Sequence, residues 1–212
     1  MMRRALAWGA FVLAATLAGC SAIPDKPVRA TLYDFGPAQG GNPGADLPSS
    51  LPALVLADVE TTGALDGSAV LYRLGYADDH QLRPYSQARW SAPPPQLIRQ
   101  RLRQRLGRER AVLDLGESAG LARNGGNAPR VLRMGLEEFS HLFESESQSW
   151  GLLRLRVTLM DNTVAGEQLL AQRTFVVRKP APTADAPGGV RALTAATDAV
   201  AEEIAQWMQG LR

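Results

Sequence analysis

The chain has 212 residues, of which 45% are hydrophobic, with 23 basic and 21 acidic residues, one cysteine and two histidines. A chain of this length suits one domain with its own hydrophobic core. The near-balanced charge provides no large excess of basic residues, which a nucleic-acid-binding protein would use to contact phosphates. One cysteine and two histidines exclude a disulfide and a multi-histidine metal site within one chain. We therefore expect no metal, no cofactor and no nucleic-acid partner.

The first residues have the pattern of a secretory signal peptide. Arg3 and Arg4 precede an apolar run over residues 5–18, and small residues stand before Cys20. Gly9 interrupts the run, which is shorter than the roughly 20 apolar residues of a membrane-spanning helix. The sequence therefore predicts a cleaved signal peptide and disfavours a permanent transmembrane anchor.

Leu17-Ala18-Gly19-Cys20 resembles a bacterial lipobox. In that motif the cysteine sulfur carries a diacylglycerol, the chain is cut before the cysteine, and the new amino group receives a fatty acid such as palmitate. The resemblance implies a signal peptide over 1–19, lipid attachment at Cys20 and a lipidated tether over 20–30. Several acyl chains on one residue make such an anchor effectively permanent.

Ser21 bears on which membrane the anchor would enter. In lipoproteins of bacteria with two membranes, an aspartate at this position tends to retain the protein in the inner membrane. Ser21 stands there instead, so the resemblance favours the outer membrane, with the protein lipid-anchored on its periplasmic face.

The first half of the chain after residue 31 alternates short strands with one helix. Three prolines lead into the helix, for which Ser91 is the expected N-cap. Ile98, Leu102 and Leu106 form one apolar stripe on it, and the apolar run that follows suggests a βαβ crossover. The expected elements are strands at 31–35, 51–59, 68–74, 81–90 and 111–115 and a helix at 96–106.

Three long extended runs and a closing helix make up the second half. Met134 and Leu136 share one face of the first run before the phase changes to Phe139, which predicts a β-bulge near Glu137 and Glu138. The expected elements are strands at 131–143, 153–159 and 169–177 and an amphipathic helix at 189–211. Residues 31–212 are thus expected to form one α/β domain, with a mixed β-sheet, an antiparallel C-terminal meander and packed helices.

The sharpest catalytic motif is Gly116-Glu117-Ser118-Ala119-Gly120, which matches the G-x-S-x-G turn of serine hydrolases. That turn needs a helix after it, whereas the following residues are rich in glycine and asparagine. The only later histidine, His141, lies in an expected strand, where we expect it to be exposed, and no aspartate stands between the two. We therefore interpret Ser118 as a loop residue, expect no catalytic residue, and keep a small periplasmic serine hydrolase as the less favoured alternative.

Two charged groups leave binding and structural interpretations open. The arginines of the helix at 96–106 face anionic lipid or an acidic partner, or form a solvated face balanced by acids elsewhere, and the second interpretation is favoured. A group of glutamates binds a cation or forms a solvated edge, and again we favour the second. The residues are Arg99, Arg101, Arg103 and Arg105, and Glu137, Glu138, Glu144 and Glu146.

The stretch from residue 72 to 90 also has two interpretations. His80, beside Asp78 and Asp79 in a turn, is expected to be solvated and not a metal ligand. Around it arginines interleave with aromatic residues, a mixture typical of protein interfaces and equally of a hairpin with half-buried rings. These residues are Arg73, Arg83 and Arg89, with Tyr72, Tyr76, Tyr85 and Trp90.

Three blocks, in this order, resemble the family of ABC-type transport auxiliary lipoproteins. The first is Tyr33-Asp34-Phe35-Gly36-Pro37, which follows the lipobox. The second runs from Leu71 to Asp78 and continues to Trp90. The third is Leu170-Ala171-Gln172-Arg173-Thr174-Phe175, followed by a proline-alanine segment and the closing helix. The likeness covers about residues 31–210.

This resemblance implies a non-enzymatic accessory subunit with an α/β domain. Similar lipoproteins are outer-membrane partners of Mce-type lipid transport systems, in which an inner-membrane permease and ATPase work with a periplasmic Mce-domain protein. The implied role is to dock that protein, and a homo-oligomer would suit docking onto a conduit. A lipoprotein activator of an envelope enzyme is the alternative. Only Cys20 carries over as a functional position.

Overall fold

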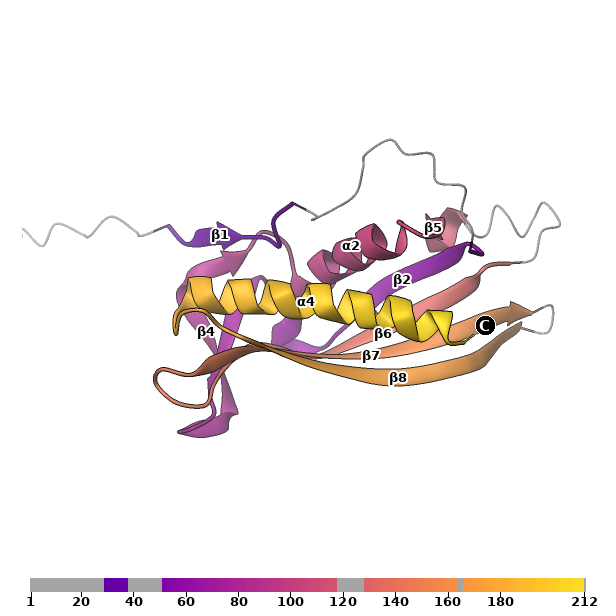
Figure 1. The fold of residues 1–212 in the computed structure, drawn as a ribbon. Helices are drawn as coiled ribbons and strands as arrows, with labels where there is room; N and C mark the ends of the chain where they lie inside the picture. Colours follow the sequence, from indigo (N-terminus) through magenta and orange to yellow (C-terminus); the bar gives the residue numbers. More distant parts are fainter. Residues whose placement is uncertain (1–28, 38–50, 118–127, 164–165, 212) are drawn as a thin grey trace, which may run out of the picture.

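The computed structural model describes residues 29–37, 51–117, 128–163 and 166–211. Within them eight strands form one mixed sheet on which two long helices pack (Figure 1). The strands are β1 (Thr31–Tyr33), β2 (Leu54–Glu60), β3 (Ala69–Leu74), β4 (Asp78–Trp90), β5 (Val112–Leu113), β6 (Arg130–Phe143), β7 (Ser149–Thr163) and β8 (Gly166–Pro180). The helices are the 3-10 helix η1 (Gly63–Asp66), α2 (Pro94–Leu106) and α4 (Ala186–Gln209). This is the single α/β domain that the sequence predicts.

β6 is the strand around which the sheet is organised. Along one edge it pairs antiparallel with β7 over its whole length. Along the other edge it pairs in parallel twice, with β2 near its start and with β3 over its last residues. The sheet therefore branches at β6: β5 continues from β2, whereas β4 and β1 continue from β3.

A β-bulge divides β6 where the change of hydrophobic phase predicts it. The register with β7 shifts between Leu136 and Glu138. Because the extra residue reverses the alternation, Leu136 and Phe139 both point into the core, and each is at most 4% exposed. The predicted bulge is confirmed, and it lets one strand serve both branches of the sheet.

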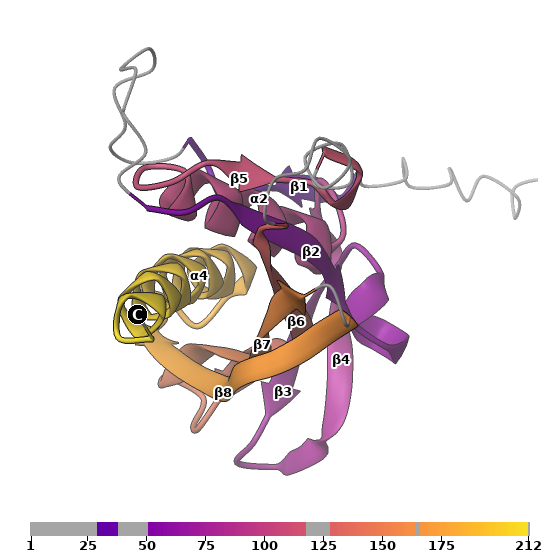
Figure 2. The same ribbon diagram turned by 90° about the vertical axis from the view of Figure 1, so that its right-hand side faces the viewer.

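β7 and β8 form the expected antiparallel meander with β6. Leu153, Leu155, Val157 and Leu159 of β7 alternate with polar or less buried residues and are at most 1% exposed. These residues face α4, which lies across β6, β7 and β8 inside the curve of the sheet (Figure 2). Period-2 alternation therefore places one apolar face under one helix.

α4 is fixed at its start by a side-chain cap and by close contact with β7. The Asp185 carboxylate accepts a hydrogen bond from the Gly188 amide at 2.8 Å, which satisfies one free N–H of the first turn. Gly151 of β7 lies under the helix, and a Cβ added there would lie 2.4 Å from the Ala192 carbonyl carbon. The helix backbone thus rests directly on the strand.

α2 begins differently from the prediction. Its N-cap is Pro93, which makes no side-chain cap hydrogen bond. Ser91 was the predicted cap, but its amide donates to the Tyr33 carbonyl at 2.7 Å and so extends the β1–β4 pairing. The extended backbone of Pro93 and the prolines of the first turn start the helix without a hydroxyl cap.

Two strands are shorter than the sequence predicts, and the strands before and after α2 do not pair with each other. β1 ends at Tyr33, so Phe35 leaves the sheet and is buried in the core. β5 spans only two residues and pairs in parallel with β2. β4, the strand that enters α2, runs antiparallel to β3 and therefore also to β6, β2 and β5, which are parallel to β3. The predicted βαβ crossover was therefore wrong. Among the described helices, none has the length and hydropathy needed to cross a membrane.

Candidate functional site

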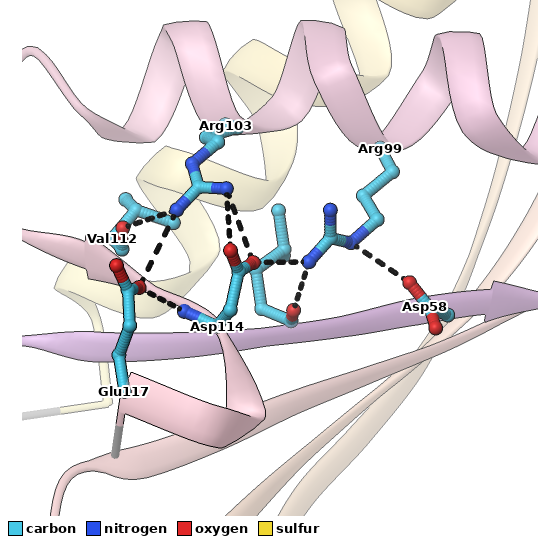
Figure 3. A network of polar contacts seen from close by, with 7 residues as sticks. Asp58, Arg99, Arg103, Val112, Asp114 and Glu117 are labelled. Atoms are coloured by element: carbon cyan, nitrogen blue, oxygen red, sulfur yellow. Dashed lines mark hydrogen bonds and ion pairs between the residues drawn. The ribbon is translucent and has the colours of Figure 1, made fainter. Parts of the chain in front are cut away.

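The arginines of α2 pair with acidic residues of the same domain. The Arg99 guanidinium contacts Asp58 at 3.2 Å and Asp114, and donates to the Leu56 carbonyl at 3.1 Å. Arg103 donates to both Asp114 carboxylate oxygens at 3.1 Å. Figure 3 shows both arginines converging on Asp114, between the helix and the strands below it. Hydrogen bonds from Arg99, and then from Arg103, hold the pKa of Asp114 below its usual range.

The other two arginines tie α2 to α4. Arg101 is only 7% exposed, donates to the Phe35 and Gly36 carbonyls, and lies 3.3 Å from Asp198 of α4. Arg105 donates to Glu202 of α4 at 3.0 Å. The four arginines are therefore balanced by acidic residues of the same domain, as favoured, and their face is partly solvated. Arg101 is buried, whereas the side chains of Arg99, Arg103 and Arg105 are 24%, 36% and 15% exposed. Each of the four guanidinium groups has an acidic partner.

Replacing Arg101 with leucine tests this structural role. The buried Phe35 carbonyl that Arg101 satisfies would lose this partner, and Asp198 would lose its cation, so the free energy of unfolding should fall by about 2 kcal/mol. Urea denaturation measures the change. Arg83→Leu is the matched control, since the Arg83 guanidinium is exposed and contacts only the Gln81 side chain. Equal losses for the two variants would contradict the assignment.

Of the aromatic residues between 72 and 90, Trp90 is buried in the core and Tyr72 and Tyr85 are half-buried. Trp90 is 2% exposed and packs against Phe35 and Phe139, with ring centroids 5.4 Å and 5.6 Å apart. Tyr72 and Tyr85 pack on each other at 4.6 Å. Tyr76 is the aromatic residue of this stretch that stays open, at 48% exposed. The contacts support the half-buried hairpin over an aromatic interface.

Arginines of the same stretch bind within the domain. Arg73 forms a bidentate pair with Glu138, and Arg89 donates to the Tyr85 and Ala88 carbonyls.

The group of glutamates is divided among separate contacts. Glu144 accepts a hydrogen bond from Trp150 Nε1 at 2.8 Å and pairs with Arg178. Glu137 lies 3.6 Å from Arg156. These carboxylates do not converge on one point, so the structural interpretation stands.

The expectation of an exposed His141 was wrong. His141 has no exposed surface, and its Nδ1 lies 2.8 Å from the Tyr85 hydroxyl. The bulge in β6 turns it inward with Phe139, and Gly189 of α4 leaves room for the ring, because a Cβ there would lie 2.4 Å from Nδ1. Burial lowers the pKa of His141 to about 4. A histidine held this way is a core residue.

This burial predicts a pH dependence of stability. The unfolded chain binds a proton at His141 near pH 6.5 and the folded chain only near pH 4, so the free energy of unfolding falls as the pH drops through this window. We expect a loss of about 2 kcal/mol, reduced from the full shift for solvent screening. Urea denaturation between pH 7 and pH 5 should show the slope, which is lost in His141→Gln. The exposed-histidine control His80→Gln should keep it, and a His141→Gln slope like that of the wild type would contradict the prediction.

His80 is solvated, as the sequence predicts, but it lies with Asp78 and Asp79 at the start of β4 and not in a turn. Its side chain is 90% exposed, and its Nδ1 lies 2.6 Å from Asp79 and 3.7 Å from Asp78. Among the described residues, this exposed trio is the group whose ligand atoms lie close enough together to hold a metal. Gln81 also donates to Asp78. Solvated hydrogen bonding accounts for these contacts.

Cys20 and Ser118 both lie outside the described residues. Glu117, next to Ser118, accepts a hydrogen bond from the Asp114 amide and contacts Arg103. The structure therefore tests neither the lipid attachment nor the serine directly. It does show that His141, the histidine that a triad would require, is sealed in the core.

The sequence analysis did not predict one exposed apolar surface, which lies on β8. Leu169, Leu170 and Val176 of β8 are exposed, whereas Phe175 and Val177 fill the core. The signal is present in the sequence, because Leu170 and Val176 occupy the opposite phase of the strand from Phe175 and Val177. β8 pairs with β7 on one side, and among the described strands it has no partner on the other, so these residues lie at an edge of the sheet.

Two solved structures share this fold. Protein XCC0632 from Xanthomonas campestris is 19% identical, with a TM-score of 0.68 over 86% of this chain and 96% of that chain. An uncharacterized protein is 16% identical, with a TM-score of 0.62 over 85% of this chain and 99% of its own. At these identities the likeness shows the fold alone. Among curated proteins, nothing matches.

Residues 33–205 match the family model described as "ABC-type transport auxiliary lipoprotein component".

Proposed function

Because the chain belongs to the family of ABC-type transport auxiliary lipoprotein components, we propose that it is a non-enzymatic docking subunit of an Mce-type lipid transport system. The observation that carries the proposal is the family match over residues 33–205, preceded by the lipobox that ends at Cys20. The match covers almost the whole described domain, and the motif supplies a means of attachment to a membrane.

The side chains of the domain support a role without catalysis. His141 is buried, and the arginines of α2 are committed to Asp58, Asp114 and the acids of α4. Catalytic sites are recognised by a nucleophile, a base and an anion-binding group that meet in a cleft. Among the described residues no such set converges, and the charged contacts serve to hold helices and strands together.

The proposal also specifies how the protein is anchored and which protein it docks. Lipid on Cys20 would hold the domain at the periplasmic face of the outer membrane, with residues 20–30 as the tether. The domain would then dock the periplasmic Mce-domain protein that works with the inner-membrane permease and ATPase. Such a subunit bridges a conduit to the membrane that receives its lipid.

Co-purification tests the partner. The full chain, tagged at its C-terminus, is crosslinked in cells and solubilised in detergent, and the captured proteins are identified by mass spectrometry. We expect the Mce-domain protein with the permease and ATPase. Capture of an envelope enzyme in their place would replace the proposal with an activator role. The neighbouring reading frames provide an independent check, since they should encode the three transport components.

A further inference from the structure

β8 is an edge strand of the sheet as the structure describes it, and its outer edge is unpaired along its whole length. Among the described strands it pairs with β7 alone, and it runs for 15 residues from Gly166 to Pro180 (Figure 1). The other margins end in short strands, β1 with three residues and β5 with two. An open edge of this length presents a row of backbone N–H and C=O groups to any extended chain.

Apolar side chains accompany this open edge. Six large hydrophobic residues of the described chain are exposed, and three of them belong to β8: Leu169 at 61%, Leu170 at 44% and Val176 at 51%. Proteins that protect an edge keep it short or interrupt it with charge or proline. β8 is long and has no proline before Pro180, but it does carry charged residues: Glu167, Arg173, Arg178 and Lys179. Three aliphatic residues stay in solvent among these charges. Exposed aliphatic residues of this kind are typical of a surface that another chain covers.

Away from the turn of the β7–β8 hairpin, where Asp161 and Glu167 lie, the charged residues of both strands are basic. From residue 150 to 160 and from residue 168 to 180 there is no acidic residue. Two of the cations there have acidic partners on neighbouring segments, Arg156 with Glu137 and Arg178 with Glu144. The remaining three have no acidic partner within the part of the chain that the structure describes. These three are Arg154, Arg173 and Lys179.

The unbalanced cations lie on both faces of the sheet beside β8: Arg154 is on the face of Val176, whereas Arg173 and Lys179 have the strand phase of Phe175 and Val177. Arg154 stands directly opposite Val176 in the β7–β8 register. Arg173 is exposed along the edge, where its guanidinium lies over the Phe175 ring, 4.8 Å from the centroid. An approaching strand would therefore meet main-chain hydrogen-bonding groups, aliphatic surface and positive charge.

We propose that the open edge of β8 binds an extended acidic segment of a partner protein, which joins the sheet as a further strand. In strand addition, main-chain hydrogen bonds supply the affinity and side chains supply the specificity. Like charges that face each other across two strands repel, so the basic residues between Arg173 and Lys179 disfavour pairing of this part of β8 with a second copy of itself. The same charge selects acidic side chains. This assignment rests on the proposed function in taking the protein to be a docking subunit, and it names the docking edge.

A photo-crosslinking amino acid at Thr174 tests the edge in cells that express the full chain. Thr174 is an exposed β8 residue, and Glu203, exposed on α4, is the matched control position. We expect a crosslink from position 174 that maps by mass spectrometry to a segment of net negative charge, and none from position 203. A crosslink to β8 of a second copy, a crosslink to a segment without acidic residues, or no crosslink at position 174 would each overturn the proposal.

Charge reversal tests the specificity. Arg173→Glu combined with Lys179→Glu should lower the crosslink yield from position 174 about tenfold, because the acidic segment would then meet like charge. Arg83→Glu combined with Arg130→Glu makes the same change of charge on β4 and β6 and should leave the yield unchanged. Thermal melts followed by circular dichroism establish that each variant is folded. An undiminished yield in the folded Arg173→Glu, Lys179→Glu variant refutes the charge selection.

The two proposals fail in different ways. If the Mce-domain protein co-purifies but position 174 forms no crosslink, the β8 assignment falls and the docking function stands. If position 174 captures an acidic strand from a protein outside any transport system, the β8 assignment stands and the transport function falls.

Discussion

Replacing Cys20 with alanine should abolish lipid attachment and remove the protein from the outer-membrane fraction. The sulfur of Cys20 is the atom that would carry the diacylglycerol, and alanine offers no substitute. Each buried CH₂ of an acyl chain contributes about 0.8 kcal/mol to membrane binding, so the loss of several chains removes essentially all of the anchoring. Metabolic labelling with an alkyne analogue of palmitate, followed by membrane fractionation, measures both effects.

The wild type and a neighbouring variant provide the controls for this prediction. Mass spectrometry of the wild-type mature N-terminus should find an acylated Cys20, and an N-terminus without fatty acids would contradict the anchor. Ser21→Asp should keep the label but move the protein to the inner membrane, because aspartate after the lipidated cysteine favours retention there. A labelled Ser21→Asp protein that remains in the outer membrane would contradict the sorting role assigned to Ser21.

Gly151→Ala should strongly destabilise the domain. The added Cβ would lie 2.4 Å from the Ala192 carbonyl carbon and 2.5 Å from the Leu193 amide nitrogen, both backbone atoms of α4. A helix backbone cannot yield as a flexible side chain does, and moving α4 away would withdraw Leu193 from the core, where it has no exposed surface. We expect the free energy of unfolding to fall by about 3 kcal/mol, measured by urea denaturation.

Gly135→Ala is the matched control, since Gly135 lies in the adjacent strand β6. A Cβ there would lie 3.4 Å from Nη2 of Arg156, the far end of an exposed side chain that can move aside. The loss should stay within about 1 kcal/mol. If the two substitutions destabilise the domain equally, then close packing of α4 on β7 is not what requires Gly151.

Local periodicity accounts for the elements that could be predicted. Leu153, Leu155, Val157 and Leu159 specify a strand with one buried face, because side chains of a strand alternate between its two sides. The break in that alternation around Glu137 specifies the bulge, since an extra residue is what reverses the phase. Such signals lie within a few neighbouring residues and need no knowledge of what the strand packs against.

Partners that are distant in the sequence account for what could not be predicted. Arg101 meets Asp198 and Arg105 meets Glu202 only because α2 and α4 lie side by side, so composition could show that the charges balance but not where they pair. His141 was misjudged for the same reason. Its burial depends on Gly189, a residue of another element whose missing side chain makes room for the ring.

The sequence by itself indicated the resemblance to a lipobox and determined the α/β composition, the bulge and the family, because each of these is encoded in contiguous residues. Only the tertiary structure decided that β6 joins two branches, that the α2 arginines pair with acids of other elements, and that β8 is an edge strand among the described strands. These properties follow from which strands and helices become neighbours, and neighbours are selected by packing over the whole domain.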